Sequence, residues 1–183
     1  MTLQTSQTQE VDERYRLHRR FDRMGRLIGD EGMQRLFDAH VMVIGVGGVG
    51  SFAAEALARS GVGRITLVDF DVICVTNANR QLHTLKGTVG KVKAEVMAER
   101  LKLVNPQMEV VASREFYNPT ASAKLMAHKP DWIVDAIDNI TAKCHLLATC
   151  RDAEIPVVCS TGAAARMDPT RIKTTDLAQT TVD

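Results

Sequence analysis

Short runs of apolar residues recur along this chain, and each is followed by a longer segment whose apolar positions repeat at helical spacing. A continuous apolar run indicates a strand covered on both faces, and the longer segments indicate amphipathic helices. The predicted strands are residues 41–44, 65–68, 108–112, 132–137 and 155–159, and the predicted helices are residues 51–59, 90–104, 120–127 and 142–153. This alternation predicts a doubly wound, Rossmann-like α/β fold: a mostly parallel sheet with helices on both faces.

The two ends of the chain depart from this alternation. Residues 1–12 are polar and lack periodicity, so we expect a disordered tail before a single domain over residues 13–183. Residues 14–26 carry a run of arginines, which is either a solvated helix face or a binding surface. A short helix is predicted to begin at Asp30. Residues 171–177 are predicted to form a further strand, after which the chain stops without a cap, so we expect the natural protein to continue.

Composition excludes several classes of protein. With 183 residues, 45% apolar and 25% charged, the chain has the make-up of a one-domain globular protein. A net charge of +1 neither requires nor excludes a nucleic-acid partner, and 4% aromatic residues argue against a base-stacking platform. Because no apolar stretch is long enough and no signal segment is present, we predict no integral membrane segment and a cytoplasmic location.

Cysteine spacing excludes a structural zinc site. Cys74, Cys144, Cys150 and Cys159 form no Cys-x-x-Cys pair, and without a secretory signal a disulfide framework is not expected. We predict four reduced, mostly packed thiols.

The sharpest local feature is a glycine-rich loop between the first predicted strand and helix, with Gly45, Gly47, Gly48 and Gly50. Glycines let the backbone turn tightly and approach a ligand, and the N–H groups at a helix start attract phosphate. Asp69 closes the second strand, where a carboxylate accepts hydrogen bonds from ribose hydroxyls. Loop and acid together predict a nucleotide site, and the absence of a Gly-Lys-Ser/Thr sequence excludes a P-loop.

Charged and polar side chains gather after this second strand in a way that favours a triphosphate over a dinucleotide. They are Asp71, Asn77, Arg80, Gln81 and Lys93. Fixed cations stabilise the charge that develops on phosphate oxygens as pyrophosphate leaves, whereas hydride transfer does not need so many. The sequence therefore predicts a triphosphate rather than a dinucleotide.

Asp138 follows the fourth strand, at the edge where ligands bind in open α/β folds. A carboxylate there suits Mg²⁺ on the ATP phosphates; the alternative is that Asp138 caps the next helix, with Asn139 and Thr141 as rival caps. Asp135, inside the strand, is predicted to pair with a neighbour in the sheet.

Taken in order, these segments resemble the ThiF/MoeB/HesA type of ubiquitin-activating-like enzymes. The matching residues are 45–50, 69–71, 76–81, 89–93, 105–106 and 135–139. The resemblance implies an adenylating enzyme, usually dimeric, in which Asp69 holds the ribose, Asp138 handles Mg²⁺ and Arg26 reaches the partner subunit's ATP. The implied ATP-binding set is Gly45, Gly47, Gly48, Gly50, Asp69, Asp71, Asn77, Arg80, Gln81, Lys93, Asp138 and Asn139, with Arg26, Arg80, Lys93 and Asp138 catalytic.

Within that family the chain is most similar to the tRNA threonylcarbamoyladenosine dehydratase branch, through residues 20–29, 74–83 and 168–178. This similarity implies that the threonyl carboxylate of the modified tRNA is adenylated and then cyclised with release of AMP. The implied partners are tRNA, a second copy of the chain, and a cysteine desulfurase or sulfur acceptor. Two alternatives stay open: adenylation of the C-terminal glycine of a ubiquitin-like sulfur carrier, and an NAD-binding redox enzyme or nucleotide sensor. The Cys-x-x-Cys pairs typical of sulfur-carrier activators are absent up to Asp183, which favours the tRNA substrate.

Overall fold

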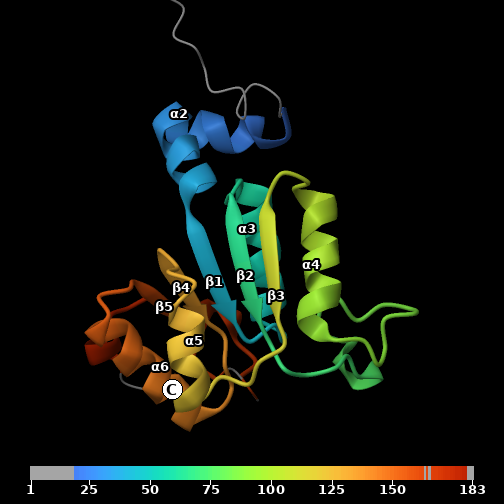
Figure 1. Cartoon of the computed structure of the whole chain (residues 1–183), viewed down its shortest axis with the longest axis vertical. Coiled ribbons are helices and arrows are strands. Elements are labelled where there is room, and N and C mark those ends of the chain that lie inside the picture. Colours follow the sequence, from blue (N-terminus) through green and yellow to red (C-terminus); the bar gives the residue numbers. More distant parts are fainter. Residues whose placement is uncertain (1–18, 163, 165, 181–183) are drawn as a thin grey trace, which may run out of the picture.

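One parallel sheet organises the domain, in the strand order β3-β2-β1-β4-β5 (Figure 1). The computed structural model describes residues 19–162, 164 and 166–180, so the predicted tail, the first arginines of the basic run and the last three residues lie outside the described residues. The strands are β1 (His40–Ile44), β2 (Arg64–Val68), β3 (Glu109–Ser113), β4 (Trp132–Asp135) and β5 (Val157–Cys159). The helices are α2 (Asp22–Asp38), α3 (Gly50–Ser60), α4 (Lys93–Val104), α5 (Pro119–Met126) and α6 (Ile140–Asp152), with 3₁₀ turns η1 (Arg19–Phe21), η2 (Val75–Asn77), η3 (Pro169–Arg171) and η4 (Leu177–Gln179).

Helices cover both faces of this sheet, which confirms the predicted doubly wound α/β fold. On one face α3 and α4 pack over Ile65 and Leu67 of β2; on the other, α5 and α6 pack over Met42 and Ile133. β1 is buried along its whole length because it lies at the centre of the sheet. The chain runs outward from β1 in one direction to β3 and then returns to β4 on the other side of β1. Such a reversal opens a crevice at the carboxyl ends of the two strands.

α2 is two helical segments joined at Gly29, whose φ of 71° and ψ of 176° interrupt the helix. Asp30 opens the second segment, as predicted, and Met33 on that segment is fully buried. The first segment projects from the amino-terminal edge of the sheet, at the top of Figure 1, and exposes Leu27. Glycine tolerates this positive φ, so the kink follows from the sequence.

The strand predicted over residues 171–177 is wrong. Those residues are exposed and run from the last residue of η3 to the first residue of η4. Asp168 accepts a hydrogen bond from the Thr170 amide and Asp176 from the Ala178 amide, so local caps satisfy the backbone in place of strand pairing. In the described part of the chain, no helix is long and apolar enough to cross a bilayer.

Candidate nucleotide site

The glycine-rich loop joins β1 to α3 at the crevice, and two of its glycines are required by the backbone itself. Gly45 has a φ of 88°, and a Cβ there would lie 2.6 Å from the Ala136 carbonyl oxygen. A Cβ on Gly50 would lie 1.8 Å from the Gly45 carbonyl oxygen. Because no larger side chain fits at either position, Gly45 and Gly50 are required for the shape of the turn.

The middle of the loop faces outward. In the described chain, the amides of Gly47, Gly48 and Val49 donate to no protein acceptor, and they precede the first turn of α3. A Cβ on Gly47 would meet the Gln81 amide nitrogen at 3.7 Å, and one on Gly48 would meet the Arg80 side chain at 3.4 Å. The loop therefore offers N–H donors at a helix start, beside Arg80 and Gln81, as a phosphate site requires.

Asp69 anchors this loop from the end of β2. Its side chain is almost buried, and its two oxygens accept hydrogen bonds from the Val46 amide at 2.7 Å and the Asp71 amide at 2.9 Å. Burial raises the pKa of the Asp69 carboxyl above its ordinary value, although both amides and the nearby Lys93 oppose the rise. The sequence analysis did not predict that Asp69 would hold the loop through this hydrogen bond from the Val46 amide. Each oxygen keeps a second lone pair for a ribose hydroxyl.

Lys93 is the first residue of α4, and its ammonium is nearly buried at the same edge. The side chain is 8% exposed, and its Nζ donates to the Asp71 carboxylate at 2.8 Å. A buried cation held by a half-exposed carboxylate is positioned in advance for an anionic ligand. The structure thus brings Lys93 and Asp71 together, as the sequence predicts.

The crossover between β2 and α4 supplies the remaining polar groups. Asn77 is buried, and its Oδ1 accepts from the Cys74 amide at 3.0 Å, so this side chain fixes the turn. Arg80 is exposed, and among the described residues its guanidinium donates only to the Thr76 carbonyl and the Asn79 side chain. Gln81 is buried, yet its Oε1 has no partner among the described residues. Arg80 is therefore the cation that is free to turn toward a ligand.

Asp138 and Asn139 lie between β4 and α6, with different surroundings. Asn139 is the N-cap of α6 and accepts from the Ala142 amide at 2.9 Å, so Asp138 is not the helix cap. Asp138 is exposed and makes no hydrogen bond or ion pair with any other described residue. No group of three metal-ligating side chains exists in the described part of the chain. One free carboxylate still fits Mg²⁺, because this ion is often held by one or two carboxylates and the phosphates of a nucleotide.

Asp135 interacts with a neighbour in the sheet, as predicted, and also with a helix. Its carboxylate is hydrogen-bonded to the thiol of Cys159, its register partner on β5, and burial together with this bond raises the pKa of Cys159. The fully buried carboxylate also accepts from the Lys143 ammonium of α6 at 2.8 Å. Lys143 also donates to the Ser160 carbonyl at 2.9 Å and approaches Cys159 at 3.4 Å. This cluster fastens α6 to the ends of β4 and β5.

Arg26 is not brought to this site within the chain. It lies on the projecting half of α2, 68% exposed, and pairs with Asp22 at 3.2 Å. α2 is at the amino-terminal edge of the sheet, whereas the glycine loop is at the carboxyl-terminal edge (Figure 1). Within one copy of the chain, Arg26 therefore has no route to the nucleotide.

The cysteines are less packed than the sequence predicts. All four are free thiols, but Cys74 and Cys144 are exposed and only Cys150 is fully buried. A hydrogen bond from the Thr76 hydroxyl lowers the pKa of Cys74, whereas burial raises the pKa of Cys150 to about 11. None of the four makes a contact that ties it to the glycine loop.

This chain is similar in sequence to two kinds of known protein, and in fold to a solved structure of one of them. An Escherichia coli protein named tRNA threonylcarbamoyladenosine dehydratase is 49% identical over 164 residues, which is 90% of this chain and 61% of that protein. The chain thus spans about three fifths of this relative's length. The crystal structure of the E. coli enzyme TcdA in complex with ATP superposes with a TM-score of 0.88 at 47% identity, over 93% of this chain and 69% of that one. The E. coli molybdopterin-synthase adenylyltransferase is 35% identical over 75% of this chain and 54% of that protein.

A family model supports the same grouping and includes nearly all described elements. It matches residues 21–180, from the end of η1 to beyond η4, and so contains the glycine loop, Asp69, Lys93 and Asp138. The chain belongs to the ThiF family.

Proposed function

We propose that this chain is the adenylating domain of an ATP-dependent tRNA threonylcarbamoyladenosine dehydratase. The observation that carries the proposal is the convergence, at one sheet edge, of outward loop amides, Asp69, Lys93, Arg80 and an unpaired Asp138. The likeness to the E. coli dehydratase and to its ATP complex supports the choice of nucleotide and substrate.

The reaction begins when the threonyl carboxylate of the modified tRNA attacks the α-phosphorus of ATP. A new P–O bond forms, the bond to pyrophosphate breaks, and an acyl-adenylate results. The substrate's own carbamoyl nitrogen or oxygen then attacks the acyl carbon and expels AMP, which carries away one carboxylate oxygen. The product has lost one water overall, and no protein nucleophile is needed.

The chain's own residues hold the phosphates in this reaction. Gly47 and Gly48 supply N–H donors, and Lys93 and Arg80 offset the charge that grows as pyrophosphate leaves. Asp69 orients the ribose. Mg²⁺, when bound with ATP, neutralises phosphate charge, and Asp138 is the residue that would hold it.

We also propose that the chain acts as a homodimer. Arg26 is exposed and, among the described residues, pairs with Asp22, while α2 lies at the edge of the sheet away from the glycine loop (Figure 1), so the role that the family resemblance implies for Arg26 is at the partner subunit's ATP. Mixing Arg26→Ala chains with Lys93→Ala chains tests this. Restored activity in the mixture supports the shared site, and a mixture as inactive as its parents refutes it.

The substrate is tested by release of AMP from labelled ATP. We expect AMP in the presence of tRNA that carries threonylcarbamoyladenosine, and none with a ubiquitin-like carrier protein. Release that depends on the carrier instead would move the assignment to carrier adenylation. We expect this activity in the cytoplasm, and a cysteine desulfurase or sulfur acceptor stays a predicted further partner.

A further inference from the structure

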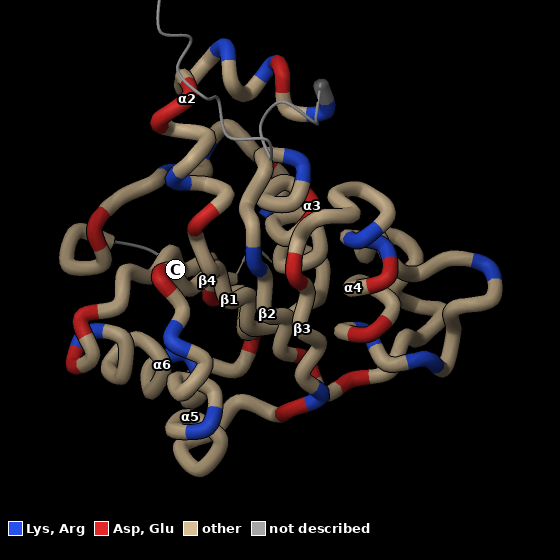
Figure 2. The backbone as a smooth tube through the Cα atoms, turned by 45° about the horizontal axis from the view of Figure 1, so that its top comes forward, with Lys and Arg blue, Asp and Glu red and all other residues tan. Residues whose placement is uncertain are grey.

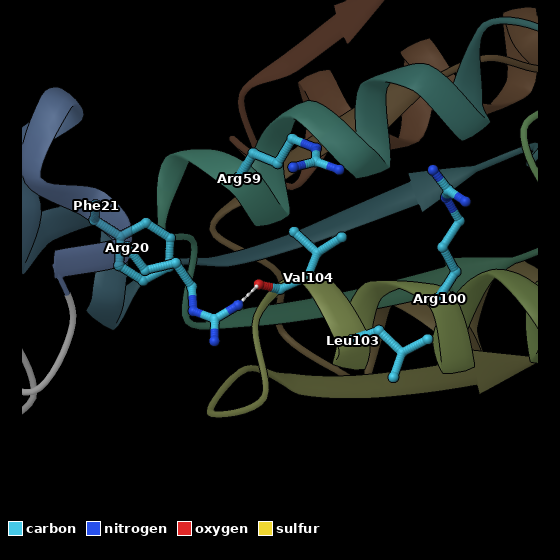
Figure 3. Close-up of a pocket in the computed structure, with 6 residues that line it drawn as sticks. All are labelled: Arg20, Phe21, Arg59, Arg100, Leu103 and Val104. Carbon is cyan, nitrogen blue, oxygen red and sulfur yellow. Dashed lines mark hydrogen bonds between the residues drawn. The ribbon is translucent and has the colours of Figure 1, made fainter.

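A hollow of about 350 Å³ lies at the ends of α3 and α4 that are farthest from the glycine loop. Figure 3 shows its six lining residues, which come from η1, α3 and α4. They are Arg20, Phe21, Arg59, Arg100, Leu103 and Val104. Three of the six carry a guanidinium and none is acidic, so the hollow is lined by one sign of charge only.

One carboxylate partly balances these arginines. Glu55 of α3 is buried, and its oxygens accept four hydrogen bonds, two from Arg59 and two from Arg100. Those guanidiniums lower the pKa of Glu55 despite the opposing effect of its burial, so the carboxylate is ionised at neutral pH. Three cations against one anion leave the hollow with a net charge of +2. The whole chain carries only +1, so this excess is local.

The guanidiniums keep donors for a ligand. Arg59 and Arg100 use Nε and Nη2 on Glu55, and neither Nη1 donates to any described residue. Arg20 donates through Nη1 to the Val104 carbonyl at 2.7 Å, which caps the end of α4 and fixes its position. Guanidinium groups with spare N–H donors favour phosphate, which they bind through paired hydrogen bonds.

The hollow also has an apolar wall. Leu103 is 82% exposed beside Arg100, and Phe21 and Val104 complete the lining. A free inorganic anion has no apolar atoms to place against such a wall. A sugar–phosphate chain can bury apolar surface there, because its ribose carbons lie beside each phosphate.

The position of the hollow suits a long ligand. α3 begins at the glycine loop and Arg59 lies near its other end, about 14 Å away at the helical rise of about 1.5 Å per residue. This distance is that of a few nucleotides along an RNA strand. α3 and α4 pack side by side on the same face of the sheet (Figures 1 and 2), and each runs from the edge with the glycine loop toward the hollow.

We infer that this arginine hollow binds the sugar–phosphate backbone of the tRNA substrate at a distance from the reacting nucleotide. The inference rests on the proposed function, which supplies the RNA. Phosphate contacts of this kind position an RNA and add affinity without reading its sequence.

The test is tRNA binding by the full chain and by Arg20→Gln/Arg59→Gln, measured across salt concentrations. This pair spares the Arg100–Glu55 contact, so no buried carboxylate is left alone. The matched control is Arg35→Gln/Arg151→Gln, which removes the same charge at two exposed positions outside the hollow. We expect about fivefold weaker binding and a salt slope smaller by about 1 to 2 in the hollow variant, with little change in the control.

Affinity for ATP, melting temperature and elution volume are measured on the same proteins. ATP affinity should be unchanged in the hollow variant, and its melting temperature should fall only slightly, because the hydrogen bonds lost with Arg20 and Arg59 come from exposed side chains. Equal tRNA affinity in both variants overturns the inference. A loss of tRNA binding accompanied by a change in oligomeric state also overturns it, since the hollow would then be a protein interface. A wild-type chain that binds ATP but no tRNA refutes the proposed function instead.

Discussion

His83 makes the stability of this domain depend on pH in a way that can be calculated. The side chain is fully buried on the crossover to α4, and neither ring nitrogen bonds to another described residue. Burial, followed by the charges of Lys93 and Arg100, lowers the pKa of His83 from 6.5 to about 4. The folded protein therefore keeps this histidine neutral in a range where the unfolded chain protonates it.

The sign and size follow from the two pKa values. Below pH 6.5 His83 is protonated in the unfolded state but stays neutral in the folded state. The free energy of unfolding therefore falls as the pH falls toward about 4. Between pH 7 and pH 5 the difference removes about 2 kcal/mol from the free energy of unfolding. Replacing His83 by leucine should abolish this part of the pH dependence and change stability at pH 7 by about 1 kcal/mol or less.

Urea unfolding at both pH values, followed by the fluorescence of the single Trp132, measures this difference. His128→Gln is the matched control, since it removes a histidine that is only partly buried and should keep the full pH dependence. A His83→Leu variant that loses as much stability between pH 7 and pH 5 as the wild-type chain would refute the reasoning, because the loss that His40 contributes is common to both proteins.

Four further substitutions distinguish residues of the proposed site from residues that stabilise the fold. Asp138→Asn should lower ATP-dependent turnover about 100-fold or more without shifting the melting temperature, because no described residue contacts this carboxylate; a parallel loss of stability would contradict its assignment. Lys143→Met should cost about 3 to 5 kcal/mol in urea unfolding, because it leaves the buried Asp135 without its partner, and a loss below 1 kcal/mol would be inconsistent with that pairing. Gly50→Ala should prevent stable folding, whereas Gly47→Ala should fold and bind ATP more weakly; equal melting temperatures for the two would show that the clash at Gly50 is relieved.

The elements that repeat along the sequence could be predicted because burial on both faces of a parallel sheet requires continuous apolar runs. The edge of the sheet that holds the site could also be predicted. Parallel strands end at the same edge, and the segments that follow these ends contain the glycine loop, Asp69 and Lys93. The prediction of a strand over residues 171–177 failed because a short segment of sequence does not reveal whether a neighbouring strand is present to pair with it.

Contacts between distant residues were not predictable from spacing. The bond from Val46 to Asp69 depends on how the loop closes over β2, and the pairing of Lys143 with Asp135 depends on where α6 packs. The arginine hollow was even less predictable from the sequence. Its residues at positions 20, 59 and 100 come close to one another only because η1, α3 and α4 pack together. Buried charges signal that partners exist, but the partners are fixed by packing.

The most direct test of the proposed reaction is mass spectrometry of tRNA nucleosides after incubation with the protein, ATP and Mg²⁺. The account predicts that threonylcarbamoyladenosine loses one water only when ATP is present, and that the Asp138→Asn variant leaves it unchanged. Unaltered nucleosides in a preparation of the full-length protein that binds both ATP and tRNA would contradict it.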